Sequence, residues 1–259
     1  NRALNSMNSH EIVPTTDEEG HGTFMASVAA GSEIPENNFV GAAPYCKIAM
    51  VKLKQAKEYL RDFYFINRDA VAYQENDIMA GVWYLNRLAQ ERHMPLVLCV
   101  GLGTDMGGHT GVNPLSTMLN GMALRRDHAV VISAGNEGNS RHHFLGEIGD
   151  DEYYKNVEIN VGDRVEGFYA EVWARAPQRF VVDIISPTGE RMPSDFILSG
   201  GREYNFLFED TKVSVDYRIA GILDGSQVIY ISFSKPTQGI WNIRVYQQSE
   251  ISSSFHIWL

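Results

Sequence analysis

The fold of the first half of the chain is set by one stretch, Ala129-Val130-Val131-Ile132-Ser133-Ala134-Gly135-Asn136-Glu137-Gly138. Its four apolar residues predict a strand, and a polar, glycine-rich turn follows directly. Leu96 to Val100 is a second, nearly continuous apolar strand, typical of one covered on both faces, and it ends in the turn Gly101 to Gly108. Between the two strands, Asn113-Pro114 predicts a helix start, with Asn as the N-cap and Pro as the first helical residue. Strand, helix and strand in this order predict a parallel sheet with a right-handed crossover.

Upstream segments extend this pattern. Ile48 to Leu53 is a predicted strand, and Asp77 is a predicted helix cap. The helix that would follow Asp77 has apolar residues at helical spacing, namely Ile78, Val82, Leu85 and Ala89. Ligands of parallel sheets bind beyond the carboxyl ends of the strands, so the turns at 101–108 and 135–139 are where a site is expected. The polar stretch Gln55 to Asn76 matches no clear element.

The composition changes near residue 150, where helical periodicity gives way to alternating Val, Ile, Phe and Tyr. Short strands separated by turn signals predict a β-sandwich or jelly roll, with Trp241 and Trp258 in its core. The predicted strands are 156–161, 167–175, 179–186, 204–209, 212–219, 227–234, 239–246 and 253–259. We therefore predict an α/β domain over residues 1–150 and an all-β jelly-roll domain over residues 151–259.

Composition excludes several classes of protein. The 259 residues are 44% hydrophobic and 21% charged, which favours a packed core over disorder. A net charge of -10 makes nucleic acid and anionic membrane surfaces poor partners. No uncharged apolar run approaches the roughly 18 residues of a membrane span, so none is expected. Cys46 and Cys99 lie in apolar stretches and are expected to be buried free thiols, too few for a disulfide framework.

Two residues are candidates for chemistry. His21 precedes a run of small residues at an expected helix start, and an imidazole can take and return a proton near neutral pH. A single histidine is nevertheless more often structural or simply exposed. Asn136 follows an apolar strand, and a fixed amide there can donate to a developing oxyanion. Taken alone, Asn136 is equally well an ordinary turn residue.

Four segments in this order resemble the subtilases, the subtilisin-like serine proteases. They are the histidine motif His21-Gly22-Thr23-x-x-Ala26, the segment Gly41-Ala42-Ala43-Pro44, the strand Leu98 to Gly103, and Ser133-Ala134-Gly135-Asn136-Glu137-Gly138. The order of the β-rich half resembles clostridial, germination-protease-like subtilases, in which a jelly roll is inserted ahead of the serine segment. Some of those relatives are pseudoproteases.

The resemblance implies a serine endopeptidase that hydrolyses a peptide or protein substrate through an acyl-enzyme, without a cofactor. His21 would be the general base and Asn136 the oxyanion donor. Gly101, Leu102 and Gly103 would pair with the substrate backbone, and Ser133, Ala134 and Gly135 would wall the pocket before the scissile bond. Asp17, just before the histidine motif, is not expected to be the triad carboxylate.

This sequence departs from the family pattern in its nucleophile. The motif Gly-Thr-Ser is absent, because Gly22-Thr23 is followed by Phe24 and Gly103-Thr104 by Asp105. An upstream strand ending in the triad aspartate is not found either. Both ends of the sequence look cut, so we expect an incomplete fragment that is inactive alone. The alternative is a pseudoprotease, or a protein-binding module without catalysis.

Two other sites are weighed and not favoured. Gly101-x-Gly103 is not a dinucleotide fingerprint, because Met106 occupies the third glycine position. His142-His143, with His109 or His10, suggests a metal site only weakly, and a surface loop pair is the expected reading. No metal or cofactor is therefore expected from the sequence, while oligomeric state and localisation stay open.

Overall fold

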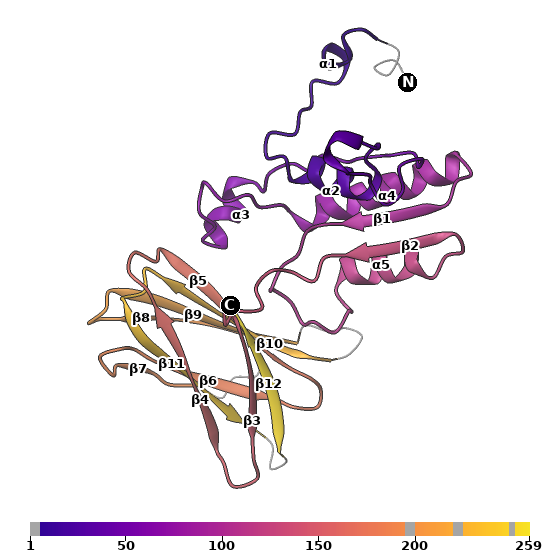
Figure 1. Ribbon diagram of the computed structural model, residues 1–259. Coiled ribbons are helices and arrows are strands. Elements are labelled where there is room, and N and C mark those ends of the chain that lie inside the picture. Colours follow the sequence, from indigo (N-terminus) through magenta and orange to yellow (C-terminus); the bar gives the residue numbers. More distant parts are fainter. Residues whose placement is uncertain (1–5, 195–199, 220–224, 249–251) are drawn as a thin grey trace. The chain divides into compact units, whose positions relative to one another are not determined.

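A computed structural model describes the chain except for residues 1–5, 195–199, 220–224 and 249–251 (Figure 1). The chain divides into two compact units. The first unit comprises Asn1–Ala56, Val71–Leu102 and Gly121–Ser133, and the second comprises Lys57–Ala70, Gly103–Asn120 and Ala134–Leu259. Each unit is described by itself below.

The first unit combines helices with a short parallel sheet. Its elements are α1 (Ser9–Ile12), α2 (His21–Ala30), the 3₁₀ turn η2 (Pro35–Asn37), α4 (Glu75–Glu91), β1 (Leu96–Val100) and β2 (His128–Ile132). β1 and β2 pair in parallel, with Leu96 opposite His128 and Val100 opposite Ile132. The two predicted strands are therefore present with parallel pairing, and helix α5 (Pro114–Ala123) lies between them in the chain.

One predicted helix start is confirmed and the other is wrong. The backbone N–H of Ser116 donates to Asn113 Oδ1 at 2.7 Å, so Asn113 caps α5. Helix α4 instead begins at Glu75 with Gln74 at its N-cap, which places Asp77 inside the first turn. An acidic residue is favourable anywhere in the first turn, because it faces the positive end of the helix dipole. An acidic residue therefore predicts the first turn of a helix, but not which residue begins it.

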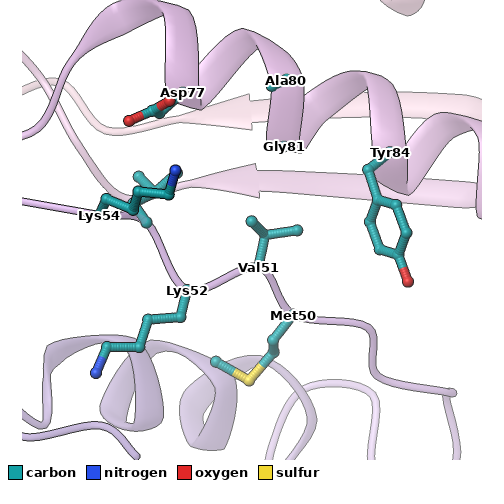
Figure 2. A pocket seen from close by; sticks show the side chains of 9 residues that line it. Met50, Val51, Lys52, Lys54, Asp77, Ala80, Gly81 and Tyr84 are labelled. Carbon is teal, nitrogen blue, oxygen red and sulfur yellow. The ribbon is translucent and has the colours of Figure 1, made fainter. Parts of the chain in front are cut away.

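The predicted strand Ile48 to Leu53 is also wrong, since this segment is irregular in the structure. It runs beside α4, where a Cβ added to Gly81 would lie 3.2 Å from Val51 Cγ1. Figure 2 shows the segment and the helix lining a hollow of about 420 Å³. A run of apolar residues indicates packing against a neighbour, whereas a strand also needs a hydrogen-bonded partner.

Both cysteines are exposed, which contradicts the expected burial. Cys99 shares a face of β1 with Val97, whose exposed fraction is 71%, whereas Leu98 on the other face is only 3% exposed. Only one face of this strand is therefore packed within the described residues. A run of apolar residues predicts strand structure, but it does not show that both faces are covered in this chain.

The second unit contains two antiparallel sheets. The six-stranded sheet has the order β3-β12-β5-β10-β9-β8, and the four-stranded sheet has the order β4-β11-β6-β7. Each predicted strand overlaps an observed one, whereas β3 and β7 were not predicted. The strands are β3 (His143–Ile148), β4 (Tyr154–Val161), β5 (Gly167–Ala174), β6 (Phe180–Ile185), β7 (Arg191–Met192), β8 (Gly200–Phe206), β9 (Thr211–Ile219), β10 (Gln227–Ser234), β11 (Gly239–Gln247) and β12 (Ser253–Trp258).

Residues of both sheets form one hydrophobic core. Trp241 is completely buried there, edge-on to Phe206 and Phe233, as predicted. The prediction for Trp258 is wrong, because this residue is only partly buried. Phe255 and Ile257 fill the core from β12, so the two-residue period of the strand turns Trp258 to the opposite face.

The polar stretch at 55–76 contains α3 (Glu58–Phe63), whose C-terminal end packs on β5. The rings of Phe63, Tyr64 and Phe65 lie 5.4 to 5.6 Å from the ring of Tyr169. Gly167 is required for this contact, because a Cβ there would lie 2.3 Å from the Phe65 ring. An aromatic cluster within a polar segment thus attaches the segment to the second unit.

Candidate functional site

His21 is the first residue of α2, and Asp17 fixes the start of this helix. The Asp17 carboxylate accepts hydrogen bonds from the Thr23 hydroxyl (2.6 Å), the Thr23 N–H (2.8 Å) and the Gly20 N–H (2.9 Å). These bonds, the Thr23 side chain foremost, lower the pKa of Asp17 to about 2. Gly20, at the N-cap, has a left-handed φ of 78° that directs the chain into the helix. Asp17 is therefore occupied in holding the helix start that carries His21.

The far end of α2 is held by the segment that begins at Gly41. The N–H groups of Gly41, Ala42 and Ala43 donate to the carbonyls of Gly31, Val28 and Ala29 at 2.8 to 3.0 Å. These bonds satisfy carbonyls that would otherwise lack partners at the helix end. A Cβ on Gly41 would lie 2.3 Å from the backbone nitrogen of Gly31, so only glycine allows this approach.

The imidazole of His21 is exposed and lies against the end of β1. Its Nε2 is 3.1 Å from the carbonyl oxygen of Gly101. A carbonyl can only accept, so Nε2 carries the hydrogen of this bond. Ser133 Oγ donates to the carbonyl of Leu102 at 3.1 Å, and the Ser133 backbone N–H donates to the carbonyl of Val100. The structure thus brings together four predicted site residues, namely His21, Gly101, Leu102 and Ser133.

The other four predicted site residues lie in the second unit and are not placed relative to His21. They are Gly103, Ala134, Gly135 and Asn136. Gly135 has a left-handed φ of 84°, and Asn136 is exposed in the turn that follows. The hollow of Figure 2 contains none of the eight predicted site residues.

Comparison with known proteins identifies the family. The sequence model of the subtilase family matches residues 4–166, more than half of the chain. The chain belongs to the subtilase family. The structure of the Clostridium perfringens CspB protease is similar to this subtilase with a TM-score of 0.83 and 28% sequence identity. The similarity covers 100% of this chain and 53% of that one, so the chain spans about half the length of its relative. A comparison with curated proteins found no match.

The subtilase chain also contains a cluster that the sequence did not predict. Asp105, Glu137 and His142 place one potential ligand atom each within 4.8 Å of the others. In the sequence, His142 is paired only with other histidines, and no ligand motif of short spacing includes it. Glu137 lies close to His142 in the sequence, whereas Asp105 belongs to the loop after β1 and is brought beside them by the fold.

The expected surface loop at His142-His143 is wrong for His143, which is the first residue of β3. Its Nε2 is 2.9 Å from His256 Nδ1, and its ring stacks on Trp258 at 3.9 Å. His109 stacks on Trp258 at 3.8 Å. Burial lowers the pKa of both His143 and His256 below the usual value. The bond between these two imidazoles needs one N–H and one lone pair, so the two rings cannot both be protonated while it forms.

The described helices have one further property that bears on partners. None of them is both long enough and apolar enough to cross a membrane.

Proposed function

We propose that this chain is part of a serine endopeptidase that hydrolyses peptide bonds in a peptide or protein substrate through an acyl-enzyme. The observation that carries the proposal is the position of His21. It heads a helix that is fixed at both ends, and its ring contacts Gly101 in the segment assigned to substrate. The family match includes both segments, and the similar solved structure is that of a protease.

The proposed roles follow the subtilase pattern. His21 takes the proton of the nucleophilic hydroxyl and returns it to the leaving amine. Asn136 donates its side-chain amide to the oxyanion of the tetrahedral intermediate. Gly101, Leu102 and Gly103 pair with an extended substrate backbone. Ser133, Ala134 and Gly135 form the wall of the pocket for the side chain before the scissile bond.

The tautomer of His21 bears on this mechanism. A general base in a serine protease accepts the hydroxyl proton at Nε2, with Nδ1–H held by the aspartate. In the structure Nε2 instead donates to Gly101. We therefore propose that the ring leaves Gly101 when the nucleophile and the aspartate are in place. Both groups would come from sequence outside these 259 residues, in keeping with the greater length of the relative.

The proposed architecture assigns residues 1–150 to a partial subtilisin-like peptidase domain with a parallel sheet flanked by helices. The parallel pair β1 and β2, with α5 between them in the chain, supports this assignment. Residues 151–259 would form the inserted jelly-roll domain, with β3 from the preceding segment added as an edge strand. The two antiparallel sheets with their shared core support a sandwich of that type.

The alternative function is a pseudoprotease or protein-binding module. Two observations favour it. The sequence contains no Gly-Thr-Ser motif, and the Nε2 of His21 is engaged by a backbone carbonyl. Under this alternative His21 is only a structural donor that ties α2 to the end of β1.

Hydrolysis of a fluorogenic peptide library by the complete product of the gene tests the proposal. We expect His21→Ala to abolish turnover and Asn136→Ala to lower kcat by about 10²–10³, the loss established for this donor in subtilisin. His10→Ala, which changes an exposed histidine in α1, is the matched control and should retain full activity. Turnover that His21→Ala leaves unchanged would refute the mechanism.

A further inference from the structure

We infer that Asp105, Glu137 and His142 form a binding site for a divalent transition-metal ion of the Zn²⁺ type. All three residues belong to the second unit, and their ligand atoms lie within 4.8 Å of one another. They come from separate segments, namely the loop after β1, the turn after β2 and the residue before β3. The inference concerns metal binding and does not depend on peptidase activity.

The distances within the cluster match ligands around an ion better than hydrogen bonds. His142 Nδ1 lies 3.5 Å from Glu137 Oε2 and 3.6 Å from Asp105 Oδ2. Hydrogen bonds from nitrogen to oxygen are about 2.7–3.2 Å long, so both separations are too long. Bonds from zinc to nitrogen or oxygen measure about 2.0–2.2 Å, which puts neighbouring corners of a tetrahedron about 3.4 Å apart. The two separations from His142 therefore already fit an ion bound between these atoms.

The donor types select the class of ion. Ca²⁺ and Mg²⁺ prefer oxygen ligands alone, whereas an imidazole nitrogen suits transition metals such as Zn²⁺. Two carboxylates with a neutral imidazole carry two negative charges, which a divalent cation balances. Three protein ligands leave one position of a tetrahedral ion for water.

The sheet holds two of the three ligand-bearing segments. The carbonyl of His142 accepts from the N–H of Leu259 at 2.9 Å. The loop of Asp105 is held at Gly107, whose N–H donates to buried Glu171 at 2.8 Å. Glu137 lies in a turn, where its carbonyl accepts from the N–H of Ser140 at 2.9 Å. The ion would thus connect this turn to two segments that the sheet already fixes.

An ion at this position has a consequence for Asn136, which directly precedes Glu137. Binding of Glu137 would fix the backbone beside the proposed oxyanion donor. This consequence rests on the proposed function, whereas the metal site does not. The competing explanation of the cluster is a protonated His142 that attracts both carboxylates without any metal.

Calorimetric titration of the untagged chain with Zn²⁺ at neutral pH distinguishes the two explanations. We expect one Zn²⁺ per chain and no comparable binding of Ca²⁺ or Mg²⁺. Affinity should fall at least tenfold in His142→Ala, Glu137→Gln and Asp105→Asn. The control variants His10→Ala and Glu147→Gln, which change exposed residues outside the cluster, should bind as the unmodified chain does. Circular dichroism of each variant without metal confirms that it is folded.

Limited digestion with trypsin gives a second, structural readout. Arg141 is exposed and lies between the ligands Glu137 and His142, so Zn²⁺ should slow cleavage after Arg141 several-fold. Cleavage at Arg125, in the turn after α5, is the internal control and should not change. Absence of Zn²⁺ binding would overturn the inference. Binding or protection that His142→Ala retains would also overturn it, because the ion would then lie elsewhere.

Discussion

At the residue scale, Asp17 shows how a single carboxylate positions the helix start that carries the proposed base His21. The Asp17 carboxylate accepts hydrogen bonds from Thr23 and Gly20, and these bonds lower its pKa to about 2. A carboxylate whose pKa is lowered by folding stabilises the fold above its unfolded pKa near 3.8. The stabilisation is lost as the pH falls from that value through about 2. The start of α2 is therefore acid-sensitive, although Asp17 is exposed.

Replacement of Asp17 tests this assignment. We expect Asp17→Asn to lower the urea midpoint of unfolding at pH 6, because the amide is a weaker acceptor for the helix-start N–H groups. The difference from the unmodified chain should shrink as the pH approaches 2. Glu18→Gln, at the neighbouring exposed carboxylate, is the control. A difference that stays constant from pH 6 to pH 2 would contradict the assignment.

Gly41 carries a second prediction at this scale. Gly41→Ala should destabilise the chain by roughly 1–3 kcal/mol, because the added Cβ would meet the backbone of Ala30 and Gly31. Gly121→Ala in α5 is the matched control, since nothing lies within 4 Å of its added Cβ. It should be neutral or stabilise by about 0.5–1 kcal/mol, as alanine does in a helix. Equal effects of the two variants in denaturant unfolding would refute the packing described for Gly41.

At the element scale, two histidines link neighbouring strands of the second unit. His143 on β3 and His256 on β12 share a hydrogen bond, and burial lowers the pKa of both. Repulsion from His109 also lowers the pKa of His143, and repulsion from His143, Arg175 and His109 lowers that of His256. A histidine whose pKa is lowered by folding binds a proton more readily when unfolded. The contribution of these two histidines to the free energy of unfolding is therefore constant above their unfolded pKa of 6.5, and it decreases as the pH drops below that value.

His143→Phe tests the pairing while keeping an aromatic ring beside Trp258. The unfolding temperature of the unmodified chain should fall between pH 7.5 and pH 5.5. We expect the variant to show a smaller fall, because one of the two titrating rings is removed. The measurement is differential scanning fluorimetry across this pH range. Equal pH dependence of the two chains would show that His143 does not contribute.

The elements also show how far the sequence predicts the structure. Hydrophobic periodicity located eight strands of the second unit, because alternation follows directly from burial of one sheet face. It failed at 48–53, where apolar residues pack against α4 without a strand partner. It also missed β3, and it missed β7, which is only two residues long. Local pattern records burial, whereas hydrogen-bonded pairing depends on distant residues.

The candidate site was predicted unevenly for a similar reason. His21 and Gly101 were found from ordered motifs, and the structure places them in contact. The cluster of Asp105, Glu137 and His142 was missed, because its members come from three separate segments. An alternating strand position predicts Trp258 in the core, but the register of β12 places Phe255 and Ile257 there and turns Trp258 to the other face. Long-range proximity of this kind is not encoded in local spacing.

At the scale of the whole molecule, the shared core of the two antiparallel sheets stabilises the second unit. Trp241→Ala removes a completely buried ring and should destabilise the chain by about 3–5 kcal/mol. Trp83→Ala in α4 removes a ring that is largely exposed and should cost less than about 1 kcal/mol. Chemical denaturation followed by circular dichroism compares the two. Similar losses in both variants would contradict the core assignment.

The central claim is that His21 serves as the general base of a subtilase-type site. Labelling of the complete gene product with a fluorophosphonate probe tests it most directly, because the probe reacts only with an activated serine. The account predicts rapid labelling that His21→Ala abolishes and His10→Ala leaves intact. A properly folded product that resists the probe, or that is labelled equally well in His21→Ala, would contradict the claim.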